Sequence, residues 1–212
     1  MSYNAMALLA LAGAAVATPL AAQTATPASV TVATEPTLDE VRALTARYQD
    51  VAAAVADGYV RDPSNTCESA DMMGLPRATG VMGIHYAHME RLGVTAPPNP
   101  RVDGTSTHTD FRRPGVLIYE PQADGSLKLV AVENLVFIKA WEAAGHTAPP
   151  TFLGHPVNRM VDDPKTELDE AHHFAPHYDL HVWLYRDNPA GMFAQFNPAA
   201  TCEHHKGSAG HH

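Results

Sequence analysis

The architecture of this chain follows from one stretch, Val116-Leu-Ile-Tyr-Glu-Pro-Gln-Ala-Asp-Gly-Ser-Leu-Lys-Leu-Val-Ala-Val-Glu-Asn-Leu-Val-Phe-Ile138. Two runs rich in β-forming apolar residues, 116–120 and 127–138, flank a turn that contains Gly125, which is the pattern of an antiparallel hairpin. The second run is apolar at both alternating sets of positions, so we expect it at the centre of its sheet.

An amphipathic helix is predicted before this hairpin, beginning after Thr37 and ending at Gly58. Thr37 and Glu40 have the spacing of a capping box, and a glycine is the usual stop signal. Between them, apolar residues recur at spacings of three and four: Val41, Leu44, Tyr48, Val51 and Val55. This apolar face is expected to pack on the sheet.

Further strands are predicted after the hairpin. Residues 178–186 indicate a third strand, and the turn at 187–191 leads into a fourth at 192–196. Residues 81–92 suit either a helix or a strand through Ala87. The proline-bearing, acidic segment 140–176 is predicted to be a long irregular excursion of the kind that often binds or covers a site. The fold class expected is α+β, a single domain with an antiparallel sheet, an N-terminal amphipathic helix packed on it, and long loops.

The two ends are predicted to lie outside this domain, which we place at 37–206. Residues 1–22 carry no charge and end in small residues, which favours a secretory signal peptide over an apolar N-terminal helix, with 1–5 as possible cloning residues. Residues 23–36 suit a flexible leader, and 207–212 a linker with a shortened affinity tag. The predicted location is therefore periplasmic or secreted.

Composition narrows the function classes. The net charge is −9, whereas nucleic-acid binding needs a basic patch. No segment after residue 22 is long and apolar enough to span a membrane. The sequence also lacks a phosphate-binding loop, a dinucleotide fingerprint and a serine nucleophile elbow. A small molecule or a metal ion is the expected partner.

The two cysteines, Cys67 and Cys202, lie far apart in the sequence. In an exported chain they predict one disulfide that ties an early loop to the C-terminal segment. The alternative, two thiolate metal ligands, has less support because neither cysteine belongs to a CxxC pair.

Histidine placement suggests metal chemistry. All 13 histidines lie at or beyond His85, and imidazole is the commonest metal ligand in proteins. His211 and His212 belong to the predicted tag, and the acidic-loop residues His172 and His173 are expected to be exposed. The two histidines predicted to bind metal are those in apolar segments, His85 and His181.

Glu133 is the strongest single anomaly, because it interrupts an apolar strand where an unpaired carboxylate would be costly to bury. Together, His85, Glu133 and His181 would form an open site suited to zinc, copper or iron, and ligand type alone does not choose between these metals. The alternatives are an edge position facing solvent for Glu133 and a hydrogen-bonded core histidine for His181.

Glu120 and His88 are secondary metal candidates. Regular pairing in the hairpin would set Glu120 opposite Leu127 and about 20 Å from Glu133, so the two carboxylates are not expected to share a metal. His88 precedes a charged pair, and exposure is the simpler expectation for it.

Two further groups bear on what such a site would do. His177, Asp179 and His181 are spaced by two residues and would lie on the same face of a strand. His177 and Asp179 are therefore candidates for proton transfer if the protein is a metal-dependent hydrolase or oxidoreductase. Alternatively, the chain is a small-molecule binding module whose pocket contains Tyr86, Trp183 and Tyr185. A third possibility is a structural domain with surface histidines.

Residues 55–202 resemble a family of exported bacterial proteins to which no activity is attached. The resemblance is carried by several motifs: Gly80-Val-Met-Gly-Ile-His-Tyr86, Tyr119-Glu-Pro121, Leu129-Val-Ala-Val-Glu133, Tyr178-Asp-Leu-His-Val-Trp183, Asn188-Pro-Ala-Gly-Met-Phe193, Phe196-Asn-Pro198 and Cys202. It implies a role for the motif-bearing positions His85, Glu120, Glu133 and His181, and directs attention away from the acidic-loop histidines. It implies neither a named fold nor a reaction.

Overall fold

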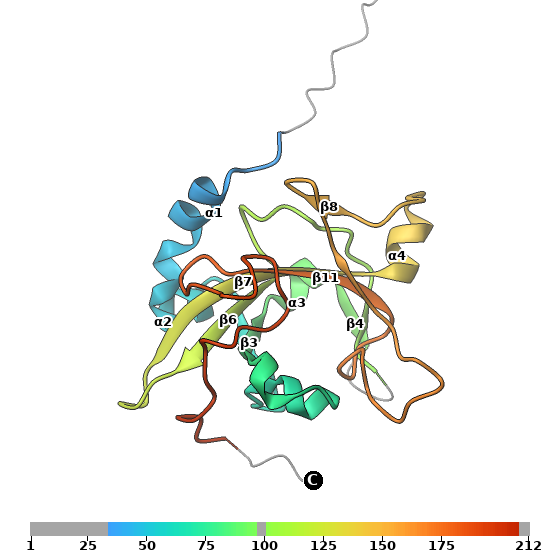
Figure 1. The fold of residues 1–212 in the computed structure, drawn as a ribbon. Helices are drawn as coiled ribbons and strands as arrows, with labels where there is room; N and C mark the ends of the chain where they lie inside the picture. Colours follow the sequence, from blue (N-terminus) through green and yellow to red (C-terminus); the bar gives the residue numbers. More distant parts are fainter. Residues whose placement is uncertain (1–33, 97–100, 208–212) are drawn as a thin grey trace, which may run out of the picture. The chain divides into compact units, whose positions relative to one another are not determined.

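A seven-stranded sheet forms the centre of the computed structural model, which describes residues 34–96 and 101–207 (Figure 1). The strand order is β1-β3-β6-β7-β11-β10, and β2 pairs with β3 as well. The strands are β1 (Val60–Arg61), β2 (Glu68–Ser69), β3 (Val81–Ala87), β6 (Val116–Pro121), β7 (Leu127–Phe137), β10 (Asn158–Met160) and β11 (His177–Val182). All pairs in this sheet are antiparallel, and the predicted α+β single domain is confirmed.

Short elements surround the sheet. Two separate two-stranded sheets pair β4 (Val94–Ala96) with β5 (Asp103–Gly104) and β8 (Thr151–Phe152) with β9 (His155–Pro156). The helices are α1 (Leu38–Thr45), α2 (Val51–Ala56), α3 (Met89–Leu92) and α4 (Ile138–Ala143), with 3₁₀ helices η1 (Ala46–Gln49), η2 (Ala70–Met73) and η3 (Arg77–Thr79). In the described part of the chain, no helix is long and apolar enough to cross a membrane.

The N-terminal helical segment begins where its sequence predicts, but it is not one helix. The Thr37 hydroxyl accepts a hydrogen bond from the Glu40 amide at 3.2 Å, which caps α1. The Glu40 side chain binds Arg112 at 2.7 Å and does not complete a capping box. Asp50 then caps a second helix by accepting from the Ala52 amide. A second capping residue inside the apolar repeat therefore divides the segment into α1, η1 and α2.

The β6–β7 hairpin is confirmed, and its register corrects the regular pairing. Glu120 lies opposite Lys128 and not Leu127, because the turn closes between Gln122 and Ser126. Further from the turn, Tyr119 pairs with Leu129, whereas the preceding residue, Ile118, pairs with Ala131. Val130 is therefore an extra residue that forms a β-bulge. The bulge moves each following side chain of β7 to the opposite face of the sheet from the one that regular alternation would give.

The bulge determines which face of the sheet Glu133 occupies. Uninterrupted alternation from Leu129 would place Glu133 on the face that carries Tyr119. With Val130 inserted, Glu133 lies opposite Val116 and shares the other face. This shift separates Glu133 from the main apolar core.

The two faces of the sheet are buried differently. The first face carries Leu117, Tyr119, Val132, Leu180 and Val182, and packs against Val41, Tyr48 and Ala54 of the N-terminal helical segment, which runs along the sheet in Figure 1. The second face carries an apolar cluster that includes Val116, Ile118, Val130, Ala131 and Leu135. At the centre of the second face, buried charged side chains and histidines interrupt the apolar layer.

Three predicted strand or loop assignments are corrected. The third strand ends at Val182, earlier than expected. Residues 192–196 form no strand; there the Ala194 amide bonds the Gly191 carbonyl, and the chain then bridges to β3 through Asn197. The excursion 140–176 is partly ordered, since it contains the end of α4 and strands β8, β9 and β10. Residues 81–92 are a strand through Ala87 followed by α3.

The predicted disulfide is confirmed. Cys67 and Cys202 are bonded with their Cα atoms 5.8 Å apart, and the described residues include no free cysteine. The predicted signal peptide at 1–22, the leader up to Ala33 and the tag residues after Gly207 lie outside the described residues.

Candidate metal centre

Three strands bring His85, Glu133 and His181 together on the second face of the sheet. Glu133 of β7 lies directly opposite His181 of β11. On its other side Glu133 faces Val116 of β6, which in turn faces Ala87 of β3. His85 precedes Ala87 by two residues and so shares its face. The long His85 side chain reaches Glu133 across β6.

The three side chains form a buried cluster that could hold a metal ion. One ligand atom from each lies within 4.8 Å of the others. The Glu133 Oε2 atom is 3.6 Å from His85 Nε2 and 3.7 Å from His181 Nε2. Ordinary N–H···O hydrogen bonds span about 2.7–3.2 Å, so neither contact is one. Among the described residues, Glu133 Oε2 and both His181 ring nitrogens are buried without a hydrogen-bond partner.

Burial sets the charge state of this cluster. Burial, with the nearby Asp179 and Glu68 carboxylates, holds the pKa of Glu133 well above its usual range. Burial lowers the pKa of both His85 and His181, the latter strongly. Burial therefore disfavours the charged form of all three groups when no cation is bound. Neutral imidazole is the form that binds metals.

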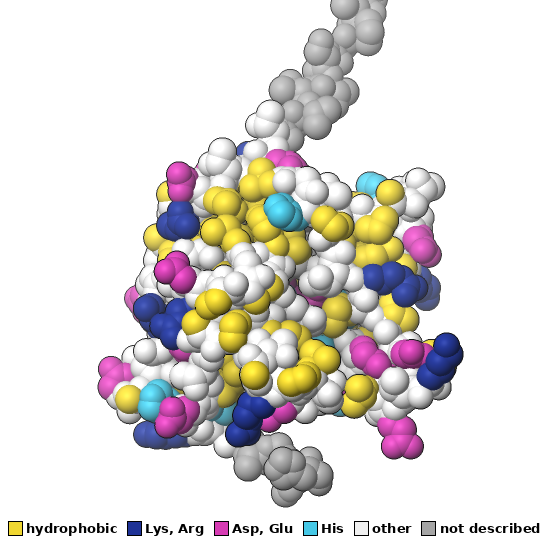
Figure 2. All heavy atoms as spheres, viewed as in Figure 1, with side chains coloured by type: hydrophobic (Ala, Val, Ile, Leu, Met, Phe, Trp, Pro, Cys, Tyr) yellow, Lys and Arg dark blue, Asp and Glu magenta, His cyan; other side chains and the backbone are white. Residues whose placement is uncertain are grey.

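A cavity of about 60 Å³ opens beside the cluster. Its apolar wall includes Met82, Leu92, Leu135 and Phe174, and its polar wall adds Asp62, Glu68, His172, His177 and Asp179 to the three cluster residues. A buried water needs about 10–15 Å³ of such space, so a few waters or one small molecule fit. Figure 2 shows charged side chains of both signs dispersed over the visible surface, in contrast to this internal concentration of polar groups.

His177 and Asp179 line the same cavity from β11. The His177 ring lies with Nδ1 3.0 Å from the Ala175 carbonyl oxygen, and burial lowers the pKa of His177 to about 4. Asp179 accepts a hydrogen bond from Asn158 at 3.0 Å, and burial raises the pKa of Asp179 to about 6. Both are thus placed where a proton could be exchanged with a molecule in the cavity.

The secondary metal candidates lie elsewhere. Glu120 accepts a hydrogen bond from the Thr201 amide at 2.9 Å and faces Arg186. His88 caps α3 by accepting from the Arg91 amide at 3.2 Å. Neither side chain lines the cavity, so their roles are local contacts in the fold.

The three aromatic residues predicted to form a ligand pocket are not brought together. Tyr86 packs edge-on against Tyr119 in the core of the first face. Tyr185 bonds Thr45 and the Arg42 carbonyl beside the same core. Trp183 belongs to the second face and donates to the Ala194 carbonyl at 2.7 Å. None of the three lines the cavity, which removes the aromatic basis for a small-molecule module.

Three polar residues that line the cavity, Asp62, Glu68 and His172, were not expected there. The His172 side chain is 14% exposed, although its acidic neighbourhood predicts a solvated loop. Its Nδ1 atom lies 3.3 Å from Glu68 Oε2. Glu68 follows Cys67 directly, so the predicted disulfide was the one sequence signal that could have marked it. No local signal marks His172, because its burial depends on how the loop folds back.

Comparison with protein-family models, with curated protein sequences and with solved structures finds no match to this chain.

Proposed function

We propose that this chain is a metal-binding protein that holds one zinc, copper or iron ion with His85, Glu133 and His181. The observation that carries the proposal is a pair of distances. Glu133 Oε2 lies 3.6 Å from His85 Nε2 and 3.7 Å from His181 Nε2, close to the spacing between two ligand atoms of one metal ion. Donor atoms about 2.1 Å from a tetrahedral zinc ion lie about 3.4 Å apart. Such spacing suits a shared cation better than direct hydrogen bonding.

The charge balance also favours a cation. A buried carboxyl group with two neutral imidazoles has ligand lone pairs but, in the described part of the chain, no hydrogen-bond donor for Glu133 Oε2. A divalent ion would stabilise the ionised carboxylate and so offset its burial. Without an ion, the same group must protonate to stay buried.

Three protein ligands leave at least one coordination position open, which is typical of catalytic rather than structural sites. An ion with an open position polarises a bound substrate or water molecule. His177 and Asp179 are the residues proposed to exchange a proton in that cavity. The reaction would be a metal-assisted hydrolysis or an oxidation of a small substrate.

We also propose that the protein is exported. The uncharged apolar segment 1–22 supports export, and the Cys67–Cys202 disulfide fits an oxidising compartment. Mass spectrometry of protein recovered outside the cytoplasm tests this point, because an intact N-terminus there would contradict cleavage of a signal peptide.

Elemental analysis tests the metal proposal. The chain without residues 207–212 is exposed to zinc, copper or iron, washed, and assayed for bound metal. We expect one ion per chain, and at least a tenfold weaker affinity in Glu133→Gln and His181→Ala. The exposed His204 provides the matched control, and His204→Ala should bind as the unsubstituted chain does. Substoichiometric metal that neither cluster substitution changes would contradict the proposal.

A further inference from the structure

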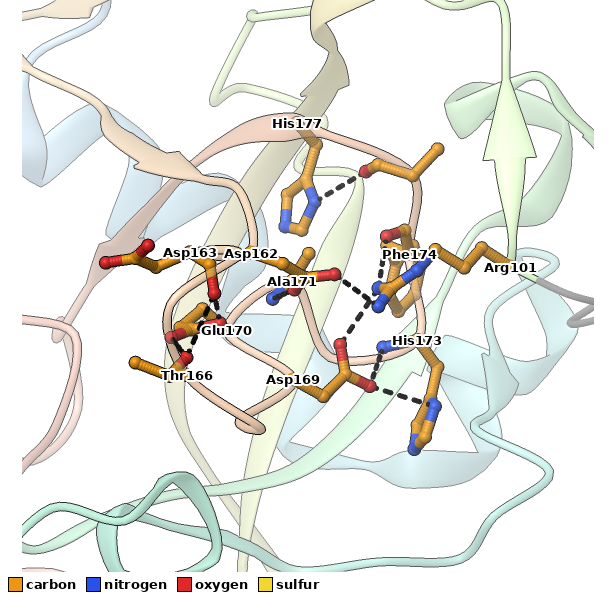
Figure 3. A network of polar contacts seen from close by, with 11 residues as sticks. Arg101, Asp162, Asp163, Thr166, Asp169, Glu170, Ala171, His173, Phe174 and His177 are labelled. Atoms are coloured by element: carbon orange, nitrogen blue, oxygen red, sulfur yellow. Dashed lines mark hydrogen bonds and ion pairs between the residues drawn. The ribbon is translucent and has the colours of Figure 1, made fainter.

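The loop between β10 and β11, residues 162–176, lies across the cavity and is called the strap here. Arg101 fastens it, because the guanidinium binds Asp162 and Asp169 and donates to the Phe174 carbonyl at 2.9 Å (Figure 3). Val102 adds two backbone hydrogen bonds to the strap, one to the His173 carbonyl and one from the Ala175 amide. Arg101 and Val102 therefore hold the strap on both sides of His172.

The tip of the strap directs two adjacent histidines in opposite directions. His172 is 14% exposed, whereas His173 is 81% exposed. Both have left-handed backbone conformations, with φ of 52° and 65°. Asp169 stabilises this turn by accepting from the His173 amide at 2.8 Å. Non-glycine residues in this region cost energy and are common where a side chain is held for a function.

The surroundings of the His172 ring are those of a metal-binding histidine. Its Nδ1 atom lies 3.3 Å from Glu68 Oε2, so a proton on Nδ1 faces a carboxylate and the Nε2 lone pair is left available. Metal-bound histidines nearly always have such a carboxylate or carbonyl partner.

The Nε2 atom of His172 is buried and, within residues 34–96 and 101–207, has no hydrogen-bond partner. His172 lines the same cavity as His85, Glu133 and His181. It is outside the group whose ligand atoms all lie within 4.8 Å of one another. His172 thus shares the cavity with the cluster but is not part of it.

We propose that His172 is a fourth protein ligand of the same metal ion, and that metal binding draws the strap inward onto the site. The inference rests on the proposed metal site, because it uses the position that three ligands leave open. With His172 bound, a four-coordinate ion is closed, so substrate would reach it only as a fifth ligand or after His172 dissociates. The ligand class is a transition metal that accepts a nitrogen-rich, four-coordinate site, such as Zn²⁺ or Co²⁺.

Titration with cobalt chloride tests His172 as a ligand, because the visible spectrum of Co²⁺ reports its coordination. The tag-free chain is compared with His172→Gln and with His173→Gln, the matched control from the same turn. We expect His172→Gln to change the position and intensity of the cobalt bands and to weaken affinity about tenfold or more. His173→Gln should leave both unchanged. Glu68→Gln retains the imidazole and should show a smaller loss of affinity, which gives a second variant.

Hydrogen exchange tests closure of the strap. Zinc should slow exchange of the amides at 169–175 in the unsubstituted chain and in His173→Gln, but not in His172→Gln. If His172→Gln keeps the original cobalt spectrum, affinity and zinc-induced protection while Glu133→Gln abolishes binding, the inference fails and the three-residue site stands. If the unsubstituted chain binds no cobalt, both proposals fail.

Discussion

At the scale of single residues, Glu133 links stability to function. Burial raises the pKa of its carboxyl in the metal-free fold, whereas the same group in the unfolded chain has a pKa of about 4.3. The unfolded state therefore releases a proton that the folded state retains, and metal-free stability falls as pH rises. A metal ion would reverse this effect by stabilising the ionised form.

This reasoning predicts a pH-dependent effect of Glu133→Gln in chelator-treated protein. Glutamine does not ionise, so the variant should gain stability relative to the original chain as pH rises from 4 to 7.5. The slope should approach about 1.4 kcal/mol per pH unit between the unfolded and folded pKa values. Urea unfolding of both proteins at several pH values measures this change in their stability difference. A stability difference that is constant over this range would show that Glu133 is ionised in the metal-free fold.

At the scale of elements, the bulge at Val130 explains where sequence-based prediction succeeded and where it stopped. The hairpin and the start of the first helix follow from local patterns. So does the choice of His85, Glu133 and His181, because each is a polar residue within an apolar segment. The extra residue in β7 does not, because the run Leu129-Val-Ala-Val132 is apolar at every position and gives no alternation to count. The burial of His172 was equally beyond local patterns, since it requires the strap to fold back across the sheet.

Arg101 offers a test of how the strap is held. Its ion pairs with Asp162 and Asp169 and its carbonyl contact all involve the strap. Hydrogen bonds to charged groups contribute about 1.5–3 kcal/mol, so Arg101→Gln should speed proteolysis and amide exchange within 162–176. Arg112 has comparable contacts outside the strap, and Arg112→Gln should leave strap exchange unchanged. Equal exchange rates in both variants would mean that backbone contacts alone hold the strap.

At the scale of the whole molecule, the disulfide connects the edge of the sheet near Glu68 to the C-terminal segment. Cys67 precedes Glu68, and the loop closed by the disulfide has a sequence separation of 135. Closing a loop of such length is expected to stabilise by about 4–5 kcal/mol in the chain-entropy description. The same bond lies next to Glu68, whose carboxylate is 3.3 Å from His172 Nδ1.

Replacing both cysteines, Cys67→Ser with Cys202→Ser, should lower the free energy of unfolding by about 4 kcal/mol. Reductant should destabilise the original chain similarly and leave the double variant unchanged, which is the control. Urea unfolding with and without reductant gives the comparison. A loss below about 1 kcal/mol would indicate that the C-terminal segment is held by its packing rather than by the disulfide.

The central claim is that His85, Glu133 and His181 bind one metal ion. Anomalous diffraction from crystals of the zinc-loaded protein at the zinc absorption edge tests it most directly. We predict one peak about 2.0–2.2 Å from a ring nitrogen of each histidine and from a Glu133 oxygen. A density map with no anomalous peak between these three side chains, at full zinc loading, would contradict the account.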